Sequence, residues 1–382
     1  MKRIPASLTF TLPLSLFLLI GCTTAEVEPT VVDQPETPPV ETEQPTEPEV
    51  PVEPEPVVTT ASLYAIGDIL LHDTVYNAAK AGEGFDFNPG FQEVAPILQD
   101  ADIAIANQES MIGGSEIGLS SYPAFNSPYE IGDALKEAGI DLVTTANNHT
   151  LDRGVRAIEN SINYWNEIDM PYTGSFISEE DKATIRTLTE NDISFAFLAY
   201  TYGTNGVVAK QPYHVNYIDM ELIRSDVEKA EDAADMTVVS LHFGNEYEVL
   251  PNASQEALVQ DLADLGVDIV IGHHPHVLQP IAWVDGANGN RTFVAYSLGN
   301  FLSGQQGDDR NTGGIVGIDV VKTTLGDETT FELANPVFYP TFTRRASAGY
   351  FEVVPLEKAK PELFNPTRDH MTQWMEELDI RQ

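Results

Sequence analysis

The chain has 382 residues, and its 59 acidic and 20 basic side chains give a formal net charge of −39. This charge excludes the broad basic surface that nucleic-acid binding requires, and it argues against adsorption onto an anionic bilayer. The chain contains a single cysteine, which excludes a disulfide framework, so the fold must be held together by its core alone.

Residues 1–21 are typical of a lipoprotein signal peptide. Two basic residues near the start precede an apolar run, Leu8–Ile20, that is too short to span a bilayer comfortably. The segment Leu19–Cys22 resembles the lipobox of bacterial lipoproteins, which implies cleavage before Cys22 and lipid attachment to that residue. The alternative is an ordinary secretory signal with an incidental cysteine. We therefore expect a cell membrane lipoprotein on the extracytoplasmic face.

Residues 22–60 predict the lipidated Cys22 followed by a disordered tether. From residue 25 onward the segment is rich in Glu, Pro, Thr and Val, with ten acidic residues and no basic or aromatic one. Such a composition cannot bury enough apolar area to offset the entropy of ordering, and its Glu-Pro and Val-Pro steps favour extended conformations. We expect a spacer that can hold a domain roughly 100 Å from the membrane; the alternative is a protein-binding tail.

Residues 61–382 predict one large domain in which strand-like and helix-like runs alternate. Helical spacing is present at residues 131–138, 154–168, 222–234 and 258–265. The alternation indicates βαβ units with parallel strands. Further strand-like runs at 184–188, 193–200, 292–296, 314–321 and 329–333 have hairpin-type neighbours. The sheets should therefore be mixed, and two stacked sheets with helices outside fit the count.

Five apolar runs end in residues that can hold a metal. They are Ser62–Ile66 before Asp68, Ile103–Ala106 before Asn107 and Glu109, Leu142–Ala146 before Asn148 and His149, Val238–Leu241 before His242, and Ile269–Ile271 before His274 and His276. Ligands in open α/β sheets lie outside the carboxyl ends of the strands. One sheet that contains these five strands would gather the polar side chains at one rim, which predicts a metal site.

Several of the candidate metal ligands also have an alternative interpretation. His274 and His276 would face one cavity if their segment is extended, whereas His273 would point the other way and be structural. Asp68 and Glu109 are candidate carboxylate ligands; the alternative for an isolated acid at a strand end is capping or solvation.

Asn148 offers a neutral carbonyl ligand, and the adjacent His149 is placed to donate a proton to a leaving group. Asp152 either orients His149 or caps the following helix. His72 either reaches the site or merely lines it. Additional site residues are possible at His72, Asn107 and Glu246.

Six ordered motifs resemble the CapA/PgsA family of bacterial capsule and poly-γ-glutamate synthesis proteins, which is related to the calcineurin-like metallophosphatases. The motifs are Gly67-Asp68-Ile69-Leu70-Leu71, Asn107-x-Glu109, Ala146-Asn147-Asn148-His149-x-x-Asp152-x-Gly154, His242-Phe243-Gly244-x-Glu246-Tyr247, Gly272-x-His274-Pro275-His276-Val277-x-Gln279 and Tyr296-Ser297-Leu298-Gly299-Asn300-Phe301. The resemblance implies an α/β fold, a four-layer α/β/β/α metallophosphatase-like sandwich with mixed sheets.

The resemblance also implies two divalent metal ions, with Zn, Mn and Fe equally compatible with the ligands. Asp68 and His276 would hold one ion, Asn148, His242 and His274 would hold the other, and Glu109 would lie between them. His149 would be the general acid, with Asp152 as its catalytic partner. The chain departs from the superfamily at Leu70, where a His is expected, and at Glu109, where an Asp is expected, so the first metal is expected to be weaker or to recruit His72.

These features lead to three functional hypotheses. The first is a cell-surface lipoprotein of capsule or poly-γ-glutamate biosynthesis or export, which meets membrane proteins of that process and an anionic polymer. The second is an extracytoplasmic metal-dependent hydrolase acting on a phosphoester or a polymer linkage. The third is a non-catalytic ligand-binding lipoprotein. Arg344 and Arg345 either supply local positive charge for an anionic substrate or form a solvated pair.

Overall fold

The computed structural model describes residues 55–382, so the predicted signal peptide, Cys22 and most of the predicted tether lie outside the described residues. The first strand, β1, begins at Val57, which is earlier than the boundary predicted at residue 61. The reason is that Val57–Thr60 pair with residues 321–324 of a long antiparallel neighbour. Among residues 55–382 no helix combines the length and the apolar character needed to cross a bilayer.

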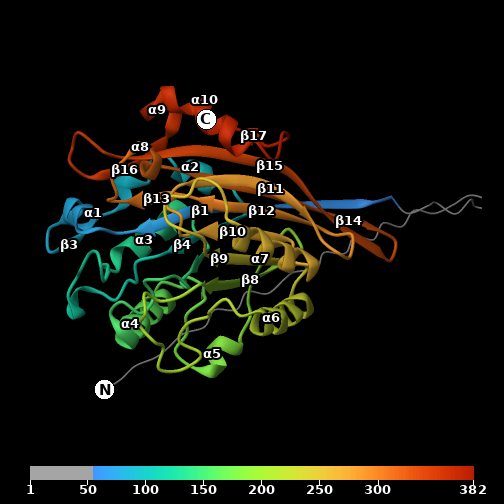
Figure 1. Cartoon of the computed structure of the whole chain (residues 1–382), viewed down its shortest axis with the longest axis horizontal. Helices are drawn as coiled ribbons and strands as arrows, with labels where there is room; N and C mark the ends of the chain where they lie inside the picture. Colours follow the sequence, from blue (N-terminus) through green and yellow to red (C-terminus); the bar gives the residue numbers. More distant parts are fainter. Residues whose placement is uncertain (1–54) are drawn as a thin grey trace, which may run out of the picture. The chain divides into compact units, whose positions relative to one another are not determined.

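The first sheet is mixed and has the strand order β16-β15-β14-β1-β4-β5-β6, with β13 paired to β1 and β17 paired to β15. Its strands are β1 (Val57–Leu70), β4 (Ile103–Gln108), β5 (Leu142–Thr144), β6 (Tyr172–Thr173), β13 (Asn300–Ser303), β14 (Thr312–Leu325), β15 (Glu328–Arg345), β16 (Phe351–Pro355) and β17 (Asp379–Ile380). The β1, β4, β5 and β6 strands run parallel, whereas β14 is antiparallel to both β1 and β15 (Figure 1).

The second sheet has the order β11-β12-β10-β9-β8-β7. Its strands are β7 (Arg186–Glu190), β8 (Ile193–Thr201), β9 (Met236–His242), β10 (Ile269–His273), β11 (Leu278–Asp285) and β12 (Arg291–Leu298). The predicted assignment of the five metal-bearing runs to one sheet is therefore wrong, because β1, β4 and β5 belong to the first sheet and β9 and β10 to the second. Runs that are buried on both faces are continuously apolar, and this pattern does not identify the sheet that contains them.

The helices occupy the connections between strands. They are α1 (Asp73–Ala78), α2 (Ala95–Leu98), α3 (Glu130–Ala138), α4 (Gly154–Glu167), α5 (Glu179–Ala183), α6 (Met220–Ala233), α7 (Ala253–Asp264), α8 (Asp308–Asn311), α9 (Leu356–Ala359) and α10 (Pro361–Met371). A small hairpin of β2 (Lys80–Ala81) and β3 (Gly84–Phe85) follows α1, and short 3-10 turns lie at Asn88–Gly90 and Ser115–Ile117. The four helices predicted from apolar spacing correspond to α3, α4, α6 and α7.

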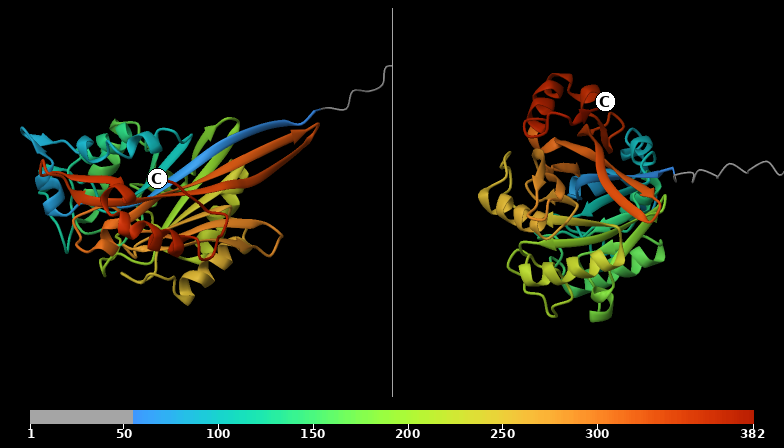
Figure 2. Two further views of the ribbon diagram at one scale, coloured as in Figure 1. Left: turned by 90° about the horizontal axis from the view of Figure 1, so that it is seen from above. Right: turned by 90° about the vertical axis from the view of Figure 1, so that its right-hand side faces the viewer.

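Three apolar clusters separate four layers. In β1, Leu63 and Ala65 face a core shared by the two sheets, whereas Tyr64 and Ile66 face the helices that cover the first sheet. Alternate side chains of β8 likewise divide between the shared core and a cluster with α6 and α7, which lie side by side on the second sheet (Figure 2). Because side chains alternate across a strand, each sheet is packed on both faces. The predicted α/β/β/α sandwich is confirmed.

Aspartates at the amino ends of four parallel strands fix the alignment of their neighbours. Each lies directly before a strand and accepts a backbone hydrogen bond from the adjacent strand. The bonds are Ser62 N to Asp102 Oδ2 at 2.8 Å, Ala104 N to Asp141 Oδ2 at 2.7 Å, Ser194 N to Asp235 Oδ2 at 2.9 Å and Thr237 N to Asp268 Oδ2 at 2.7 Å. A shift of one residue would break such a bond and reverse the faces of the strand.

Asp268→Asn tests how much free energy the burial of one of these carboxylates costs. Burial raises the pKa of Asp268 to about 6, so its folded-state pKa exceeds that of the unfolded chain. The burial cost is therefore absent below about pH 4 and fully present above about pH 6. Asn keeps an acceptor for Thr237 N without the charge. We expect the variant to gain on the order of 2 kcal/mol of unfolding free energy relative to wild type between pH 4 and pH 7.5.

Urea unfolding at both pH values measures this difference. Asp235→Asn is the matched control, since Asp235 accepts the equivalent bond from Ser194 at an exposed position. If the difference in unfolding free energy between Asp268→Asn and wild type did not change with pH, this would contradict the raised pKa of Asp268.

Candidate metal centre

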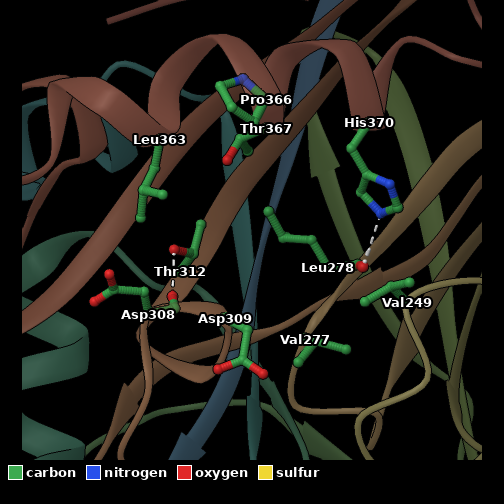
Figure 3. A pocket seen from close by; sticks show the side chains of 10 residues that line it. All are labelled: Val249, Val277, Leu278, Asp308, Asp309, Thr312, Leu363, Pro366, Thr367 and His370. Atoms are coloured by element: carbon green, nitrogen blue, oxygen red, sulfur yellow. Dashed lines mark hydrogen bonds between the residues drawn. The ribbon is translucent and has the colours of Figure 1, made fainter.

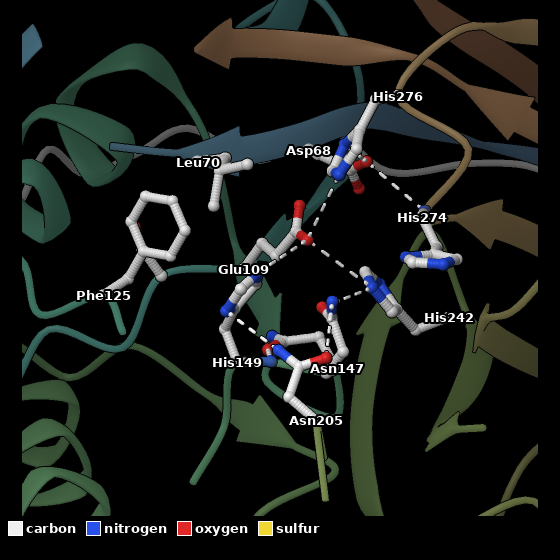
Figure 4. A network of polar contacts seen from close by, with 12 residues as sticks. Asp68, Leu70, Glu109, Phe125, Asn147, His149, Asn205, His242, His274 and His276 are labelled. Carbon is white, nitrogen blue, oxygen red and sulfur yellow. Dashed lines mark hydrogen bonds and ion pairs between the residues drawn. The ribbon is translucent and has the colours of Figure 1, made fainter. Parts of the chain in front are cut away.

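The carboxyl ends of β1, β4, β5, β9 and β10 converge on one buried cluster of polar side chains (Figure 4). Every predicted metal ligand belongs to it and is at most 4 % exposed: Asp68, Glu109, Asn148, His242, His274 and His276. The side chains come from both sheets, so the cluster lies where the two rims meet. Strand-end ligands therefore converge although the strands do not share a sheet.

Asp68 is directed into the cluster by an irregularity of β1. The register of β1 shifts between Ile66 and Asp68, and a Cβ on Gly67 would approach Gly299 O to 2.0 Å. Only glycine fits this close approach, which lets Asp68 N donate to Gly299 O at 2.9 Å. The bulge thus turns the Asp68 carboxylate toward the rim.

The Asp68 carboxylate is surrounded by donors. Asn107 Nδ2 donates to Oδ1 at 2.8 Å, and His276 Nδ1 lies 3.2 Å from Oδ2. His273 Nδ1 also lies 3.2 Å from Oδ1, so this histidine contacts Asp68 from the end of β10. Burial alone would raise the pKa of Asp68, but His273 and His276 hold it well below its usual value. The carboxylate is therefore ionised and orients the imidazoles.

The histidine segment after β10 is not extended, which corrects the reasoning that placed His274 and His276 on one side. The strand ends at His273, and His274 and His276 have φ values of 98° and 59°. Such left-handed conformations cost about 1–3 kcal/mol each for residues other than glycine. A tight turn, not strand alternation, brings both side chains to the cluster.

Glu109 lies at the centre of the cluster. Its Oε1 is 3.6 Å from His242 Nε2, 3.7 Å from His276 Nε2 and 4.0 Å from His149 Nε2. Both carboxylate oxygens are buried and accept no hydrogen bond from residues 55–382. Burial, with a contribution from Asp68, raises the pKa of Glu109 well above its usual value. A buried carboxylate without a donor is costly unless a cation compensates it.

These residues fit a divalent cation. Ligand atoms of Glu109, His274 and His276 all lie within 4.8 Å of one another, and His274 Nδ1 also has no hydrogen-bond partner in the described part of the chain. Burial and the neighbouring His276 lower the pKa of His274 to about 3, so its ring is neutral, as metal ligation requires. One carboxylate with two imidazoles is a donor set that Zn, Mn or Fe accepts.

The geometry groups these residues differently from the two-ion scheme implied by the family resemblance. His276 lies between the two carboxylates, with Nδ1 toward Asp68 and Nε2 toward Glu109. It therefore groups with Glu109 and His274, whereas the resemblance assigns His274 to the other ion. Asn148 Oδ1 lies 3.0 Å from His242 Nε2, so these two form a second set beside Glu109.

His149 and Asp152 form a pair at the edge of the cluster. His149 Nδ1 lies 2.6 Å from Asp152 Oδ2, which also accepts from Phe125 N at 2.7 Å. Helix α4 begins at Gly154 without a side-chain cap, so of the two alternatives the structure has Asp152 orienting His149. Asn147 Oδ1 accepts from His149 N at 3.0 Å. The ring is fixed with Nε2 toward Glu109.

His72 lines the site and does not join the cluster. Its Nδ1 accepts from Gly304 N at 3.2 Å, and its ring contacts Phe125 edge-on, with centroids 5.1 Å apart. The Phe125 ring in turn lies 4.7 Å from that of His149. Leu70 is buried and lies on the same side as Phe125 in Figure 4. An apolar wall therefore stands where the superfamily histidine is expected.

The other predicted site residues have different surroundings. Asn107 is a partner of Asp68 and lies 3.5 Å from His242 Nδ1. Glu246 is exposed on the loop after β9. Arg344 pairs with Glu352 at 2.9 Å and Arg345 Nε donates to Gly349 O at 2.9 Å, so neither guanidinium is free of partners.

Three residues near the cluster were not predicted. Tyr202 packs on His274 with ring centroids 4.7 Å apart, and Asn205 Nδ2 lies 3.4 Å from His149 Nδ1. Both follow β8, another apolar run that ends in polar residues, and this signal was present in the sequence. Arg310 lies over the Tyr247 ring at 5.2 Å, and that ring lies 6.3 Å from His276. Nothing in the local sequence indicates this position.

Comparisons with known proteins identify a family and relatives of this chain. Residues 62–305 match the family model described as bacterial capsule synthesis protein PGA_cap. The capsule biosynthesis protein CapA of Bacillus anthracis is 30 % identical over 257 residues, covering 63 % of this chain and 59 % of that protein. The PGA biosynthesis protein CapA of Bacillus subtilis (strain 168) is 30 % identical over 251 residues, covering 63 % and 62 %. The chain thus spans about three fifths of the length of these relatives.

Among solved structures, a putative 5'-nucleotidase from Staphylococcus aureus in complex with alpha-ketoglutarate is similar with a TM-score of 0.43 and 16 % sequence identity. The match covers 78 % of this chain and 54 % of that one.

Metal titration tests the cluster. In wild type, Zn or Mn at one hundred times its Kd should raise the unfolding free energy by about 3 kcal/mol, because the ion binds the folded state. His274→Ala should abolish most of this gain, since it removes one ligand of the Glu109 group. Thermal unfolding with and without metal measures the effect. His370→Ala is the matched control, because His370 lies on α10 and bonds Leu278 O; an equal metal response in both variants would exclude the cluster.

Proposed function

Because the chain belongs to the family of bacterial capsule synthesis proteins, PGA_cap, we propose that it serves the production of a capsule or of poly-γ-glutamate at the cell surface. The family predicted from the six motifs is confirmed by this match. The relatives named for capsule and PGA biosynthesis support the polymer role. The single observation that supports a chemical role for this protein is the buried Glu109 cluster with the His149–Asp152 pair beside it.

The proposed centre binds divalent metal at two sets of residues. Glu109, His274 and His276 form the tighter site, and Asn148 and His242 form a weaker one beside it, while Asp68 holds His276 in place. Bound metal would supply Lewis-acid polarisation of a phosphoryl or acyl oxygen of the substrate. The weaker character of the second set follows from Leu70, which offers no ligand, and from Asp68, whose oxygens are already engaged by Asn107 and His276.

The protein's own residues provide a proton donor. Asp152 holds His149 through Nδ1, so Nε2 of the ring points toward Glu109, 4.0 Å from Oε1. A group fixed in this way can protonate a departing oxygen or nitrogen. Asn147 Oδ1 accepts from the backbone N of His149, and Phe125 N donates to the Asp152 side chain. This arrangement favours hydrolysis of a phosphoester or polymer linkage over a purely ligand-binding role.

The proposed location is the extracytoplasmic face of the membrane. The lipobox-like segment ending at Cys22 and the acidic, proline-rich tether support a lipid-anchored protein held away from the bilayer. Membrane proteins of polymer synthesis or export are the partners that this location implies. An anionic polymer would be repelled by most of the acidic surface and would be attracted where metal offsets the charge.

His149→Ala tests the chemical role. With metal bound, we expect hydrolysis of a chromogenic phosphodiester to fall by about 10²–10⁴-fold, because the leaving group loses its proton donor. Metal-dependent stabilisation should persist, since His149 belongs to neither metal set. Asp152→Asn should cause a smaller loss, as the ring remains but is less well oriented. Activity that is unchanged in His149→Ala would remove this residue from the mechanism.

Complementation of a deletion strain tests the cellular role. Cys22→Ser should move the protein from the membrane fraction to the medium, because lipid attachment is lost, and surface polymer should fall. His149→Ala should remain in the membrane fraction and still fail to restore polymer. Polymer staining and cell fractionation measure both outcomes. Full restoration of polymer by both variants would contradict the proposed role of anchor and centre.

A further inference from the structure

Asn300 is a buried amide next to the candidate metal centre that no step of the proposed chemistry uses. It is the first residue of β13 and is 0 % exposed. Its Nδ2 donates to Arg310 O at 2.9 Å, to Gln305 Oε1 at 3.2 Å and to His276 O at 3.3 Å. An amide nitrogen has two hydrogens, so these three oxygens share them. Asn300 therefore joins the metal turn, which we define as residues 274–277, to the loop between β13 and β14.

The bond to His276 reaches a residue in a strained conformation. His276 has a φ of 59°, which is unfavourable for residues other than glycine, so contacts from outside the turn must hold it. Asn300 Nδ2 reaches the carbonyl group of His276 itself. Ser297 Oγ, which is also buried, donates to the carbonyl group of the next residue, Val277, at 2.7 Å. Two residues of the sequence motif Tyr296–Phe301 thus hold consecutive carbonyl groups of the metal turn.

The same motif fixes the carboxylate that faces His276. Gly299 O accepts from Asp68 N at 2.9 Å, and Asn300 lies opposite Asp68 in the parallel pairing of β13 with β1. Asp68 Oδ2 lies 3.2 Å from His276 Nδ1. The distance between this carboxylate and this imidazole is thus set from the backbone by residues that are neighbours in the chain. A change in the motif would therefore shift the His276 ring, whose Nε2 lies 3.7 Å from Glu109 Oε1.

Packing does not fill all the space around the metal turn. A hollow of about 320 Å³ is lined by Val277 and Leu278 and by Asp308 and Asp309 of the loop between β13 and β14 (Figure 3). Side chains that line an open space lose contacts on that side, so packing holds the two segments less firmly. The hydrogen bonds from Asn300 to both segments are therefore a larger share of what keeps them in place.

We propose that Asn300 and Ser297 are positioning residues of the metal centre, which hold the His276 ring between the two carboxylates and so set the affinity for the divalent ion. The proposal rests on the proposed function, since it concerns the centre described there. Both residues act through hydrogen bonds to the metal turn and not as ligands. Loss of a residue that orients a metal ligand typically weakens metal binding by about 10–100-fold.

Asn300→Asp and Asn290→Asp form a matched pair that tests the proposal. Aspartate keeps the shape of the side chain, but an ionised carboxylate cannot donate. Asn290 Nδ2 donates to Ala263 O at 2.9 Å, and Asn290 lies directly before β12, at the end of the sheet remote from the metal turn. With full-length protein, we expect the Kd for Zn to rise at least about tenfold in Asn300→Asp and to stay within about twofold in Asn290→Asp. Competition with a chromogenic chelator measures Kd.

Ser297→Ala and Thr292→Val form a second pair, which decides the matter if Asn300→Asp does not fold. Both hydroxyl groups are buried on β12, and Thr292 Oγ1 donates to Val267 O at 2.6 Å at the far end of the strand. Urea unfolding of metal-free protein should show similar losses of stability in the two variants, because each loses one buried hydrogen bond. Only Ser297→Ala should raise the Kd for Zn, by at least about fivefold.

These measurements separate the positioning role from the proposed function. If wild type binds Zn and the Kd is unchanged in Asn300→Asp and Ser297→Ala, the positioning role is overturned and the metal centre remains. A Kd that rises equally in all four variants would also overturn the positioning role, since the effect would then follow from lost stability. A wild-type protein that binds no Zn would contradict both the centre and its positioning residues.

Discussion

The arrangement of the site depends on a carboxylate that has no hydrogen-bond donor. Both oxygens of Glu109 are buried and accept no bond from residues 55–382, although three imidazoles approach Oε1 to 3.6–4.0 Å. Burial of such a group is costly unless positive charge compensates it. Without metal, a proton on His276 can supply this positive charge. The pKa of His276 rises to about 9, because the nearby carboxylates outweigh the effect of its burial. A divalent cation would compensate the same charge and release that proton.

The two sides of the centre differ in whether their ligand atoms are already engaged in hydrogen bonds. On one side, Asp68 is engaged by Asn107 and His276 and acts as the fixed acceptor that orients the ring of His276. On the other side, Glu109 and His274 retain atoms without partners. The Phe125 ring packs against the ring of His149 at one edge of the cluster. Glu109 and His274 thus keep atoms that can bind a metal, whereas the Asp68 oxygens are already engaged in hydrogen bonds.

Much of this arrangement could be predicted from continuous apolar runs that end in polar residues, because a buried parallel strand ends at the rim where ligands gather. The helices α3, α4, α6 and α7 follow from the spacing of their apolar residues, and α3 ends at Gly139, which has a φ of 104°. The division of the runs between two sheets was not predictable, since both faces of each strand are buried. The left-handed turn at His274 and the approach of Arg310 depend on distant packing, which local patterns do not encode.

The early start of β1 illustrates the same limit, whereas the role of Asp152 is decided by a local contact. Val57–Thr60 have the composition of the preceding tether, and only pairing with β14 makes them a strand. In the sequence, Asp152 lies at a strand-to-helix turn and could equally well cap the helix. Its contact with His149, within the same turn, decides between the two roles.

The aspartates before β4, β5, β9 and β10 lie at the ends of the strands remote from the cluster, and they set strand alignment from there. The residues that carry chemistry are therefore not needed to keep the sheets in register. A change of a candidate ligand would therefore leave the alignment of the strands in place. Strand alignment and the candidate metal centre are set at opposite ends of the same strands.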